Sequence, residues 1–446
     1  MSPVERRLLA AACLTTTLVP ISSTMIAVAL PDVRDDFGLS VAAAVWLVSS
    51  YLVVTAASQP VAGSLGDRLG RHRLVVFGIV GFGAASILGA AAPTFEIAVA
   101  ARCIQAVCGA LALVNAAATV RTVLPAERRG RAFGLIGASA TLSAAAGPPV
   151  GGIAVAAAGW RGTFLAVLPL VALALITVLR WLPAGEPDGA REAARSRFDV
   201  VGSVLLLGTL SLSAVLVNQL AAERPATLLV GLAAAATALA FLFARQERAH
   251  PQPVLDLGVL RVRAVAAAGV AIGASNLAQY LVLLAVPLLI EGHTSSAGAG
   301  VILAPMLVGS GIFAPIGGRL ADRYGRRAPA MGGCVVLAVA MGGMVPLDLH
   351  ENVVLTAVLL GLAGMGLGLS TSAIVTAGAE ALPAAQAGVA AGVSSSSRYL
   401  GSILGTSLLA VLVDSGTGRP VFAVAAAAAV VAALAAAAFV QDRPVR

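Results

Sequence analysis

The stretch Gly63-Ser-Leu-Gly-Asp-Arg-Leu-Gly-Arg71 recurs 255 residues later as Gly318-Arg-Leu-Ala-Asp-Arg-Tyr-Gly-Arg326. A second similarity pairs the Leu-Pro and Gly residues of 124–130 with those of 382–388, at a spacing of 258 residues. Two similarities at nearly the same long spacing indicate an internal duplication. The sequence therefore predicts two related halves separated by an insertion.

The composition of the chain excludes an ordinary soluble protein. Hydrophobic residues occupy 59% of the 446 positions, charged residues 11%, and the mean hydropathy is +0.95. Soluble domains are about 45–50% apolar and about 25% charged. Apolar runs of about twenty residues match a hydrocarbon core about 30 Å thick, so each predicts a membrane-spanning helix. Fourteen runs qualify: 8–30, 41–62, 74–92, 97–119, 132–158, 161–182, 200–219, 226–244, 264–290, 297–317, 328–346, 352–378, 387–413 and 420–440.

The predicted fold is an all-α polytopic membrane protein with two six-helix bundles and two inserted helices. The pattern disfavours a transmembrane β-barrel, because the strands of a barrel alternate apolar and polar residues and these runs do not. The first bundle covers 1–183 and the second covers 264–446. The two inserted helices cover 200–244, flanked by cytoplasmic loops at 184–199 and 245–263.

Basic residues are distributed unequally between the two sides of the predicted bundle. All 29 are Arg; counting alternate loops places 23 on one side and four on the other, with two inside spans. Because basic residues concentrate on the cytoplasmic side, we expect a multi-pass protein of the cell membrane with both termini in the cytoplasm. Arg6 and Arg7 precede an apolar run that is long for a signal peptide, so we expect that run to remain as a span.

Parallel six-span repeats are typical of carriers that hold substrate near the bilayer midplane between two rocking halves. In the repeated loop, glycines allow a tight reversal, the Asp suits a helix N-terminus, and the arginines suit lipid headgroups. We expect a conformational latch made of Gly63, Asp67, Arg68, Gly70, Arg71, Gly318, Asp322, Arg323, Gly325 and Arg326. The alternative for either copy is a basic loop that only follows the charge rule.

With these loops, the sequence resembles the major facilitator superfamily, and within it the fourteen-span drug:proton antiporter branch. The stretch from Arg102 to Ala110 looks like the superfamily's Arg-x-x-Gln-Gly motif, and 147–164 is similar to the antiporter signature. Further landmarks of the branch are matched by Trp46, Tyr51, Phe198, Asp199, His250, Pro251, Leu255, Asp256 and Leu257. The resemblance covers nearly the whole chain and implies secondary active transport.

The antiporter signature implies a kink in the fifth span. Pro removes a backbone donor and bends a helix, whereas Gly lets a neighbouring helix approach closely. We therefore expect a tight, bent contact with the other half, of the kind that the resemblance links to exporters, at Gly147, Pro148, Pro149, Gly151 and Gly152. The alternative is a plain kink without a transport role.

The residues for proton coupling are less clear from the sequence, because no carboxylate lies near a span centre. Ser22 and Ala27 replace the acid and the amide that the branch commonly has in its first span. By resemblance, proton transfer is assigned to Arg102, and Glu96 and Glu291 are the candidates at the membrane edge. The alternatives are a structural Arg bonded to backbone or lipid, and exposed carboxylates at helix ends.

By analogy with the superfamily, the first, fourth, ninth and twelfth spans face the substrate. Each of their polar residues could bind substrate or form an interhelical hydrogen bond. The substrate-binding candidates are Ser22, Thr24, Gln105, Asn115, Asn276, Gln279, Tyr280 and Thr371. The bundle centre offers no carboxylate and few aromatic faces for a cation, so we expect an amphipathic substrate that is neutral or anionic. For Arg398, which lies in the predicted span 387–413, we expect a role in packing or in contact with lipid headgroups.

These observations predict a proton-coupled exporter of a drug-like or secondary-metabolite small molecule, acting in multidrug efflux or antibiotic resistance. The alternative is an importer or uncoupled facilitator with the same fold. We expect no enzyme activity, cofactor or metal, since the four cysteines fall inside apolar runs. Without any Lys, the chain has no phosphate-binding Gly-Lys loop for ATP. The expected partners are the substrate, protons and membrane lipids, and no nucleic acid.

Overall fold

The computed structural model describes residues 2–183, 199–221, 225–250, 258–349, 351–382, 387–413 and 418–439. Most of the predicted loop 184–199 and part of the loop 245–263 lie outside the described residues, as do these residues of the quoted motifs: Phe198, Pro251, Leu255, Asp256, Leu257 and Pro383. Every regular element that is described is a helix. The first half contains α1 (Pro3–Met25), η1 (Ile26–Ala29), α2 (Leu30–Phe37), α3 (Val41–Ala44), α4 (Trp46–Leu69), α5 (Arg71–Ala90), α6 (Phe95–Val123), α7 (Ala126–Ala158), α8 (Gly162–Leu165) and α9 (Leu168–Trp181).

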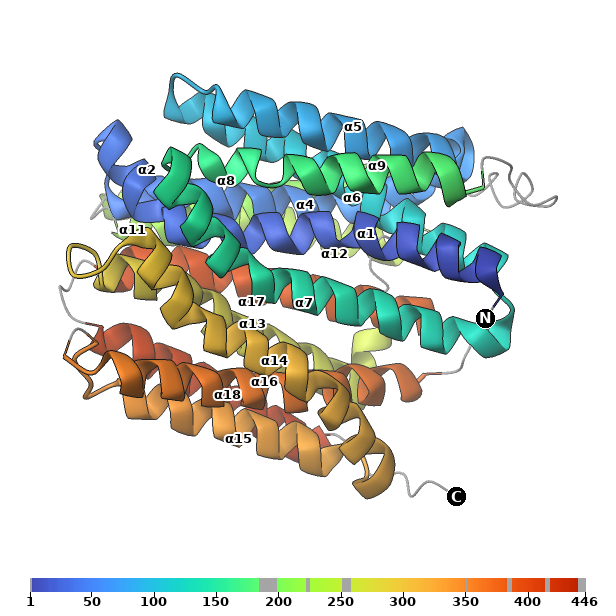
Figure 1. Ribbon diagram of the computed structural model, residues 1–446. Helices are drawn as coiled ribbons and strands as arrows, with labels where there is room; N and C mark the ends of the chain where they lie inside the picture. Colours follow the sequence, from blue (N-terminus) through green and yellow to red (C-terminus); the bar gives the residue numbers. More distant parts are fainter. Residues whose placement is uncertain are drawn as a thin grey trace.

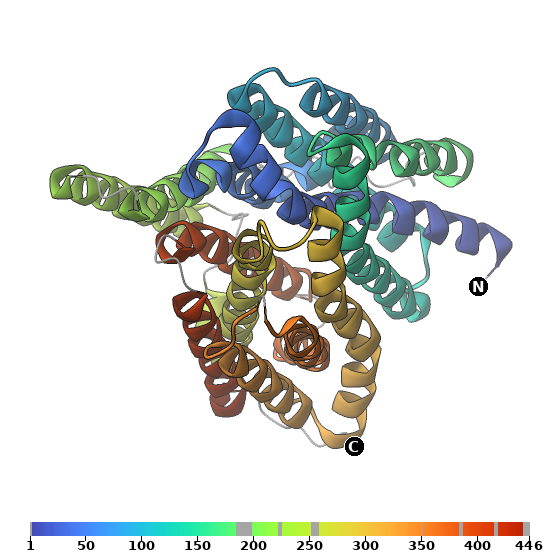
Figure 2. The same ribbon diagram turned by 60° about the vertical axis from the view of Figure 1, so that its left-hand side comes forward.

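The remaining helices form an inserted pair and a second bundle. The inserted pair is α11 (Val200–Ala221) and α12 (Ala226–Ala249), which pack on each other and project to one side of the molecule (Figure 2). The second bundle contains η2 (Val259–Arg261), α13 (Arg263–Leu289), α14 (Ser296–Tyr324), α15 (Arg327–Met344), α16 (Val353–Glu380), α17 (Ala387–Leu412) and α18 (Arg419–Phe439). Figure 1 shows the two bundles side by side with their long helices along a common axis.

Each of the fourteen predicted spans falls on a helix of this structure. Among the described residues, twelve helices are long and apolar enough to cross a membrane, and Val201–Val217 of the inserted pair is a shorter apolar helix. The chain is therefore an all-helical, multi-pass membrane protein. The two copies of the repeated loop join α4 to α5 and α14 to α15, which are the second and third long helices of their bundles.

Local sequence signals explain where several helices begin and end. The hydroxyl of Ser2 accepts from Glu5 N, and the Glu5 carboxylate accepts in return from Ser2 N, so a capping box starts α1. Ser295 caps α14 in the same way through its hydroxyl. Gly70 and Gly325 have φ of 97° and 86° between successive long helices, a conformation that costs a side-chain-bearing residue strain. The predicted tight reversal in both motif copies is therefore present.

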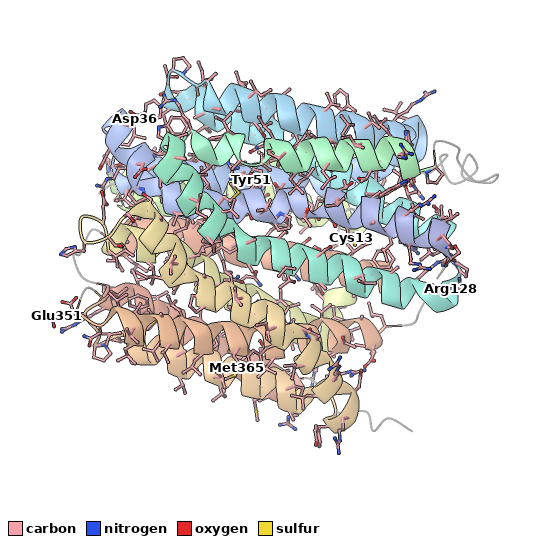
Figure 3. All side chains as sticks on the ribbon, in the orientation of Figure 1. Cys13, Asp36, Tyr51, Arg128, Glu351 and Met365 are labelled. Carbon is pink, nitrogen blue, oxygen red and sulfur yellow. The ribbon has the colours of Figure 1, made fainter. Side chains whose placement is uncertain are left out.

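The two ends of the bundle differ in charge. Figure 3 places Arg128 at one end, beside the N-terminus, and Asp36 and Glu351 at the other. The end that carries Arg128 and both repeated loops is called the basic end below, and the other is called the distal end. The largest apolar core joins residues of both halves, including Leu30 of α2 and Leu303 of α14. The halves are thus packed against each other through a shared core.

Candidate functional site

A cavity of about 660 Å³ lies between the two halves. That volume is within the usual range of about 300–1,000 Å³ for small-molecule sites. Helices of both halves line it, and it reaches toward the basic end, where Gly134 of α7 and Gly318 of α14 are part of the wall. Of the predicted substrate-binding residues, five line this cavity: Thr24, Asn276, Gln279, Tyr280 and Thr371.

One wall of the cavity is formed by α13 and α17, which approach each other very closely. A Cβ atom at Gly401 would collide with the carbonyl oxygen of Gly273, and one at Gly405 would lie 2.5 Å from Leu277 O. Small residues at these positions let the two backbones touch. The close packing holds Asn276 and Tyr280 of α13 beside Arg398 of α17 in the cavity wall.

Arg102 lies in the interior of the first half, with only 1% of its surface exposed. Its Nη1 donates to Ser22 Oγ at 2.8 Å and to Gln105 Oε1 at 2.9 Å, and its Nε donates to Leu47 O at 3.3 Å. Its guanidinium carbon lies 4.1 Å from the ring centroid of Tyr51. Among the described residues no carboxylate pairs with it, so only neutral dipoles and a ring face compensate this buried charge.

Three predicted substrate-binding residues do not line the cavity. Ser22 and Gln105 belong to the Arg102 network, where Gln105 Nε2 also donates to Ser86 Oγ at 2.7 Å. Asn115 is fully buried and donates through Nδ2 to Ala62 O at 2.9 Å, linking α6 to α4. A Cβ atom at Gly66 would collide with the Asn115 side chain, so these helices cross in contact.

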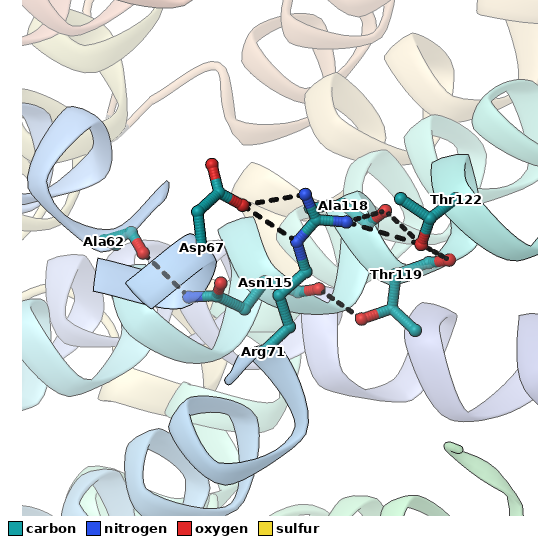
Figure 4. A network of polar contacts seen from close by, with 7 residues as sticks. All are labelled: Ala62, Asp67, Arg71, Asn115, Ala118, Thr119 and Thr122. Atoms are coloured by element: carbon teal, nitrogen blue, oxygen red, sulfur yellow. Dashed lines mark hydrogen bonds and ion pairs between the residues drawn. The ribbon is translucent and has the colours of Figure 1, made fainter. Parts of the chain in front are cut away.

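The first copy of the repeated loop binds to the end of α6 (Figure 4). Arg71 pairs with Asp67 one turn earlier, at 2.8 Å, and its Nη1 also donates to Ala118 O at 3.2 Å and to Thr122 Oγ1 at 3.3 Å. These contacts stay within the first half. The loop therefore fixes α4 and α5 to α6, and it does not itself reach the second half through these bonds.

The second copy repeats this arrangement, but its Arg meets a carboxylate on the neighbouring helix, where Arg71 meets neutral oxygens. Arg326 pairs with Asp322 at 2.6 Å and with Glu380, at the end of α16, at 2.8 Å. The hydrogen bonds that Arg326 donates to the Glu380 carboxylate raise the pKa of Arg326 above its ordinary value. The guanidinium carbon of Arg323 lies 5.3 Å from the ring centroid of Tyr324. Both copies thus tie a helix pair to the fourth long helix of its own bundle.

The glycines and prolines of the antiporter signature lie where α7 crosses α1 and α14. A Cβ atom at Gly147 would collide with the Thr24 hydroxyl, and one at Gly151 would lie 2.6 Å from Met25 O. A Cβ atom at Gly152 would lie 2.7 Å from Ser296 O of the second half. Pro148 and Pro149 remain inside one continuous helix, and Pro148 O faces Gly300 of α14. The signature therefore makes a close backbone contact between the two halves.

The distal end is held shut by polar contacts between the halves. Arg34 of α2 donates to Glu291 at 2.6 Å, and the Ser296 hydroxyl donates to Asp32 at 3.4 Å. Burial raises the pKa of Glu291, an effect that the nearby Arg34 charge opposes. Glu96 is exposed at the start of α6 and does not line the cavity. The two candidate carboxylates therefore occupy different environments.

Comparison with known families identifies the chain. The sequence profile of the Major Facilitator Superfamily matches residues 12–275 and 268–446, which together cover almost the whole chain. The chain belongs to the major facilitator superfamily. Membership of the superfamily makes it a transporter of a small molecule, embedded in membrane lipid, and not an enzyme.

Named relatives within the superfamily include drug and metabolite transporters. The multidrug resistance protein Stp of Mycobacterium tuberculosis is 31% identical over 88% of this chain and 73% of its own. The probable actinorhodin transporter of Streptomyces coelicolor is 31% identical over 92% of this chain and 74% of its own. The crystal structure of a D-xylose–proton symporter shares the fold, with a TM-score of 0.69, 15% identity and 98% coverage of both chains.

Among the cavity-lining residues that the sequence did not predict as substrate-binding are Tyr51, Arg398 and Tyr399. The sequence predicted a packing or headgroup role for Arg398, but this residue lines the cavity. It lies near the middle of α17, about 16 Å from the start of the helix at 1.5 Å per residue. Ser402, one turn later, lines the cavity as well. The i, i+4 pair of Arg398 and Ser402 is the pattern that could have indicated a polar face.

Proposed function

We propose that this protein is a secondary active exporter of a drug-like or secondary-metabolite small molecule, working by proton-coupled alternating access. The observation that carries this proposal is a cavity between two halves that are closed against each other at the distal end. A carrier of this type exposes its site alternately to the two sides by rocking the halves. The printed names of the relatives, multidrug resistance and actinorhodin transport, support a substrate of this class.

The direction of transport in this proposal depends on orientation. The excess of Arg at the basic end favours a cytoplasmic location for both termini and for the open side of the cavity. We extend the proposal to fourteen membrane crossings in a cell membrane, with the bundle boundaries 1–183 and 264–446 and the inserted helices 200–244. Substrate would then enter from the cytoplasm or the inner leaflet. The signature contact of Gly152 with Ser296 would seal the outer side.

Proton coupling in this proposal uses Arg102, Glu291 and Glu96. Burial raises the pKa of Glu291 in the closed distal end, so this arrangement binds the proton more tightly than one in which Glu291 is exposed. Protonation of Glu291 weakens its ion pair with Arg34, but the net direction of the pKa shift is upward, so protonation from outside would favour closure of the outer side and return the carrier toward the cytoplasm. That order of events is the one required for exchange of an external proton for an internal substrate.

The proposal is tested with purified protein in lipid vesicles. Vesicles that hold the fluorescent dye Hoechst 33342 or anthraquinone-2-carboxylate receive an imposed pH gradient, and the movement of each compound is followed in time. We expect one of them to move against its concentration gradient, and we expect the movement to stop when nigericin collapses the pH gradient. Equilibration without accumulation for both compounds contradicts proton-coupled export.

One observation favours a second candidate function. The described lining of the cavity contains no carboxylate, and the usual acid of the first span is Ser22. An uncoupled facilitator or an importer of an organic solute would not need such an acid. In the same vesicles, this candidate predicts that exchange of substrate is equally fast with and without the pH gradient.

A further inference from the structure

We propose that the central cavity selects organic anions, and that Arg398 binds the anionic group of the substrate. This inference rests on the proposed transport function and names the substrate class of the same cavity. Arg398 is the single charged residue among the described lining residues. A cavity wall with one cation and no acid carries a net positive charge.

Arg398 is placed to bind a ligand because no carboxylate among the described residues pairs with its charge. In the part of the chain that the structure describes, its guanidinium forms no hydrogen bond and no ion pair. The side chain remains exposed to the cavity although it lies near the middle of α17. A charged residue at this depth is costly without a partner, and an anionic ligand supplies one.

A second positive charge lies behind the same cavity. Tyr51 lines the cavity, and the Arg102 guanidinium sits 4.1 Å from the centroid of the Tyr51 ring. Arg102 also lacks a carboxylate partner among the described residues, so its charge is not cancelled locally. Electrostatic effects of this kind are strong in a site of low dielectric constant. Both arginines therefore favour an anion in the cavity and disfavour a cation.

The neutral groups around Arg398 suit an aromatic acid. Tyr280 and Tyr399 line the same cavity, and Tyr280 OH lies 3.3 Å from Ser23 Oγ of the first half. A guanidinium binds a carboxylate through two parallel hydrogen bonds, and phenol hydroxyls can donate further bonds to it. The rings can pack on the apolar body of the ligand. The substrate class is thus an aromatic carboxylate or an acidic phenol.

The test is a binding measurement in detergent, which does not depend on transport. Titration calorimetry compares three acids with their neutral amides: anthraquinone-2-carboxylate, 1-naphthoate and salicylate, each against its carboxamide. We expect at least one acid to bind at least tenfold more tightly than its amide. Arg398→Gln should bring that ratio close to 1, and Arg398→Lys should retain part of it. Arg180→Gln, which removes an exposed Arg at the end of α9, should leave the ratio unchanged.

The outcomes separate this inference from the proposed function. If no acid binds more tightly than its amide, or if Arg398→Gln keeps the preference, anion selection by Arg398 is wrong, whatever the vesicles show. If the acids bind through Arg398 but no compound accumulates in vesicles under a pH gradient, the binding inference stands and the coupled export is wrong. An equal loss of acid and amide binding in Arg398→Gln indicates a structural role and also contradicts the inference.

Discussion

Arg102 of α6 donates a 2.8 Å hydrogen bond to the hydroxyl of Ser22 in α1, a residue 80 positions earlier in the chain. The Ser22 main-chain oxygen accepts a further bond from Nη2 at 3.3 Å. The position at which the resemblance to the antiporter branch implies an acid is thus filled by a neutral acceptor beside a buried cation. Among the residues that the structure describes, Arg102 has no carboxylate partner, and this feature determines several measurable properties.

Replacement of Arg102 by Ala is expected to abolish accumulation under a pH gradient while the protein still folds and inserts. The substitution removes the donor to Ser22, Gln105 and Leu47, so the proposed coupling group is lost. Vesicle transport should show an accumulation ratio of about 1, with an unchanged elution profile in detergent. Arg180→Ala is the matched control and should transport normally. Normal accumulation by Arg102→Ala would remove Arg102 from the mechanism.

Introducing the missing acid with Ser22→Asp should pair the buried guanidinium. A hydrogen bond to a charged group contributes about 1.5–3 kcal/mol to stability. The new carboxylate would add an ion pair with Arg102, and the desolvation of that carboxylate would offset part of the gain. We expect the positive potential of the cavity to fall and the binding of aromatic acids to weaken several-fold. Calorimetry with anthraquinone-2-carboxylate and its amide measures this, and equal affinity of wild type and Ser22→Asp for the acid would contradict it.

A side chain at the crossing of α7 and α14 should loosen the closed distal end. A Cβ atom at Gly300 would lie 2.5 Å from Pro148 O, so Gly300→Ala forces the backbones apart. Overpacking of this kind typically costs about 1–3 kcal/mol. We expect a lower unfolding temperature and a leak of protons through vesicles that contain the variant. Gly342→Ala in α15, where a Cβ would meet open space, is the control.

Glu291→Gln should change how stability depends on pH. Because burial raises the pKa of Glu291 in the folded protein, its contribution to stability is fully present below the unfolded pKa and is lost as the pH rises through the folded pKa. The variant side chain stays neutral at every pH. The unfolding temperature of the variant minus that of the wild type should therefore increase as the pH rises from about 4 to about 7. Glu351→Gln, at an exposed position of the same end, should run parallel to the wild type. A parallel profile for Glu291→Gln would show that Glu291 does not titrate in this range.

Export of an anion should respond to membrane voltage. One elementary charge moved through 100 mV corresponds to about 2.3 kcal/mol, which is about fiftyfold in an equilibrium ratio. In one cycle a proton enters and a monoanion leaves, so the equivalent of two positive charges moves inward. A negative potential on the substrate side should therefore accelerate efflux. Potassium gradients with valinomycin set this potential in vesicles. Efflux of anthraquinone-2-carboxylate that is independent of valinomycin would contradict export of an anion.

The fold was accessible from the sequence to a large extent, and the site only in part. Apolar runs and the repeated motif predicted the helices and their order, because both signals are local in the chain. Thr24 and Tyr280 were found as cavity residues from the polar pattern, whereas Asn115 proved to be a packing residue between α4 and α6. A polar side chain on a membrane helix serves either purpose, and its sequence neighbours do not distinguish the two.

The sequence by itself determined the membrane-embedded helices, the duplication and the superfamily, since these follow from hydrophobic length and from motifs within short stretches. Only the tertiary structure decided that Arg34 meets Glu291 across the halves, that Arg102 has Ser22 as its partner, and that Arg398 faces the cavity. The physical reason is that these relationships depend on how helices from distant parts of the chain rotate and cross. That rotation is set by close contacts between small residues, such as Gly273 with Gly401, and no local pattern specifies it.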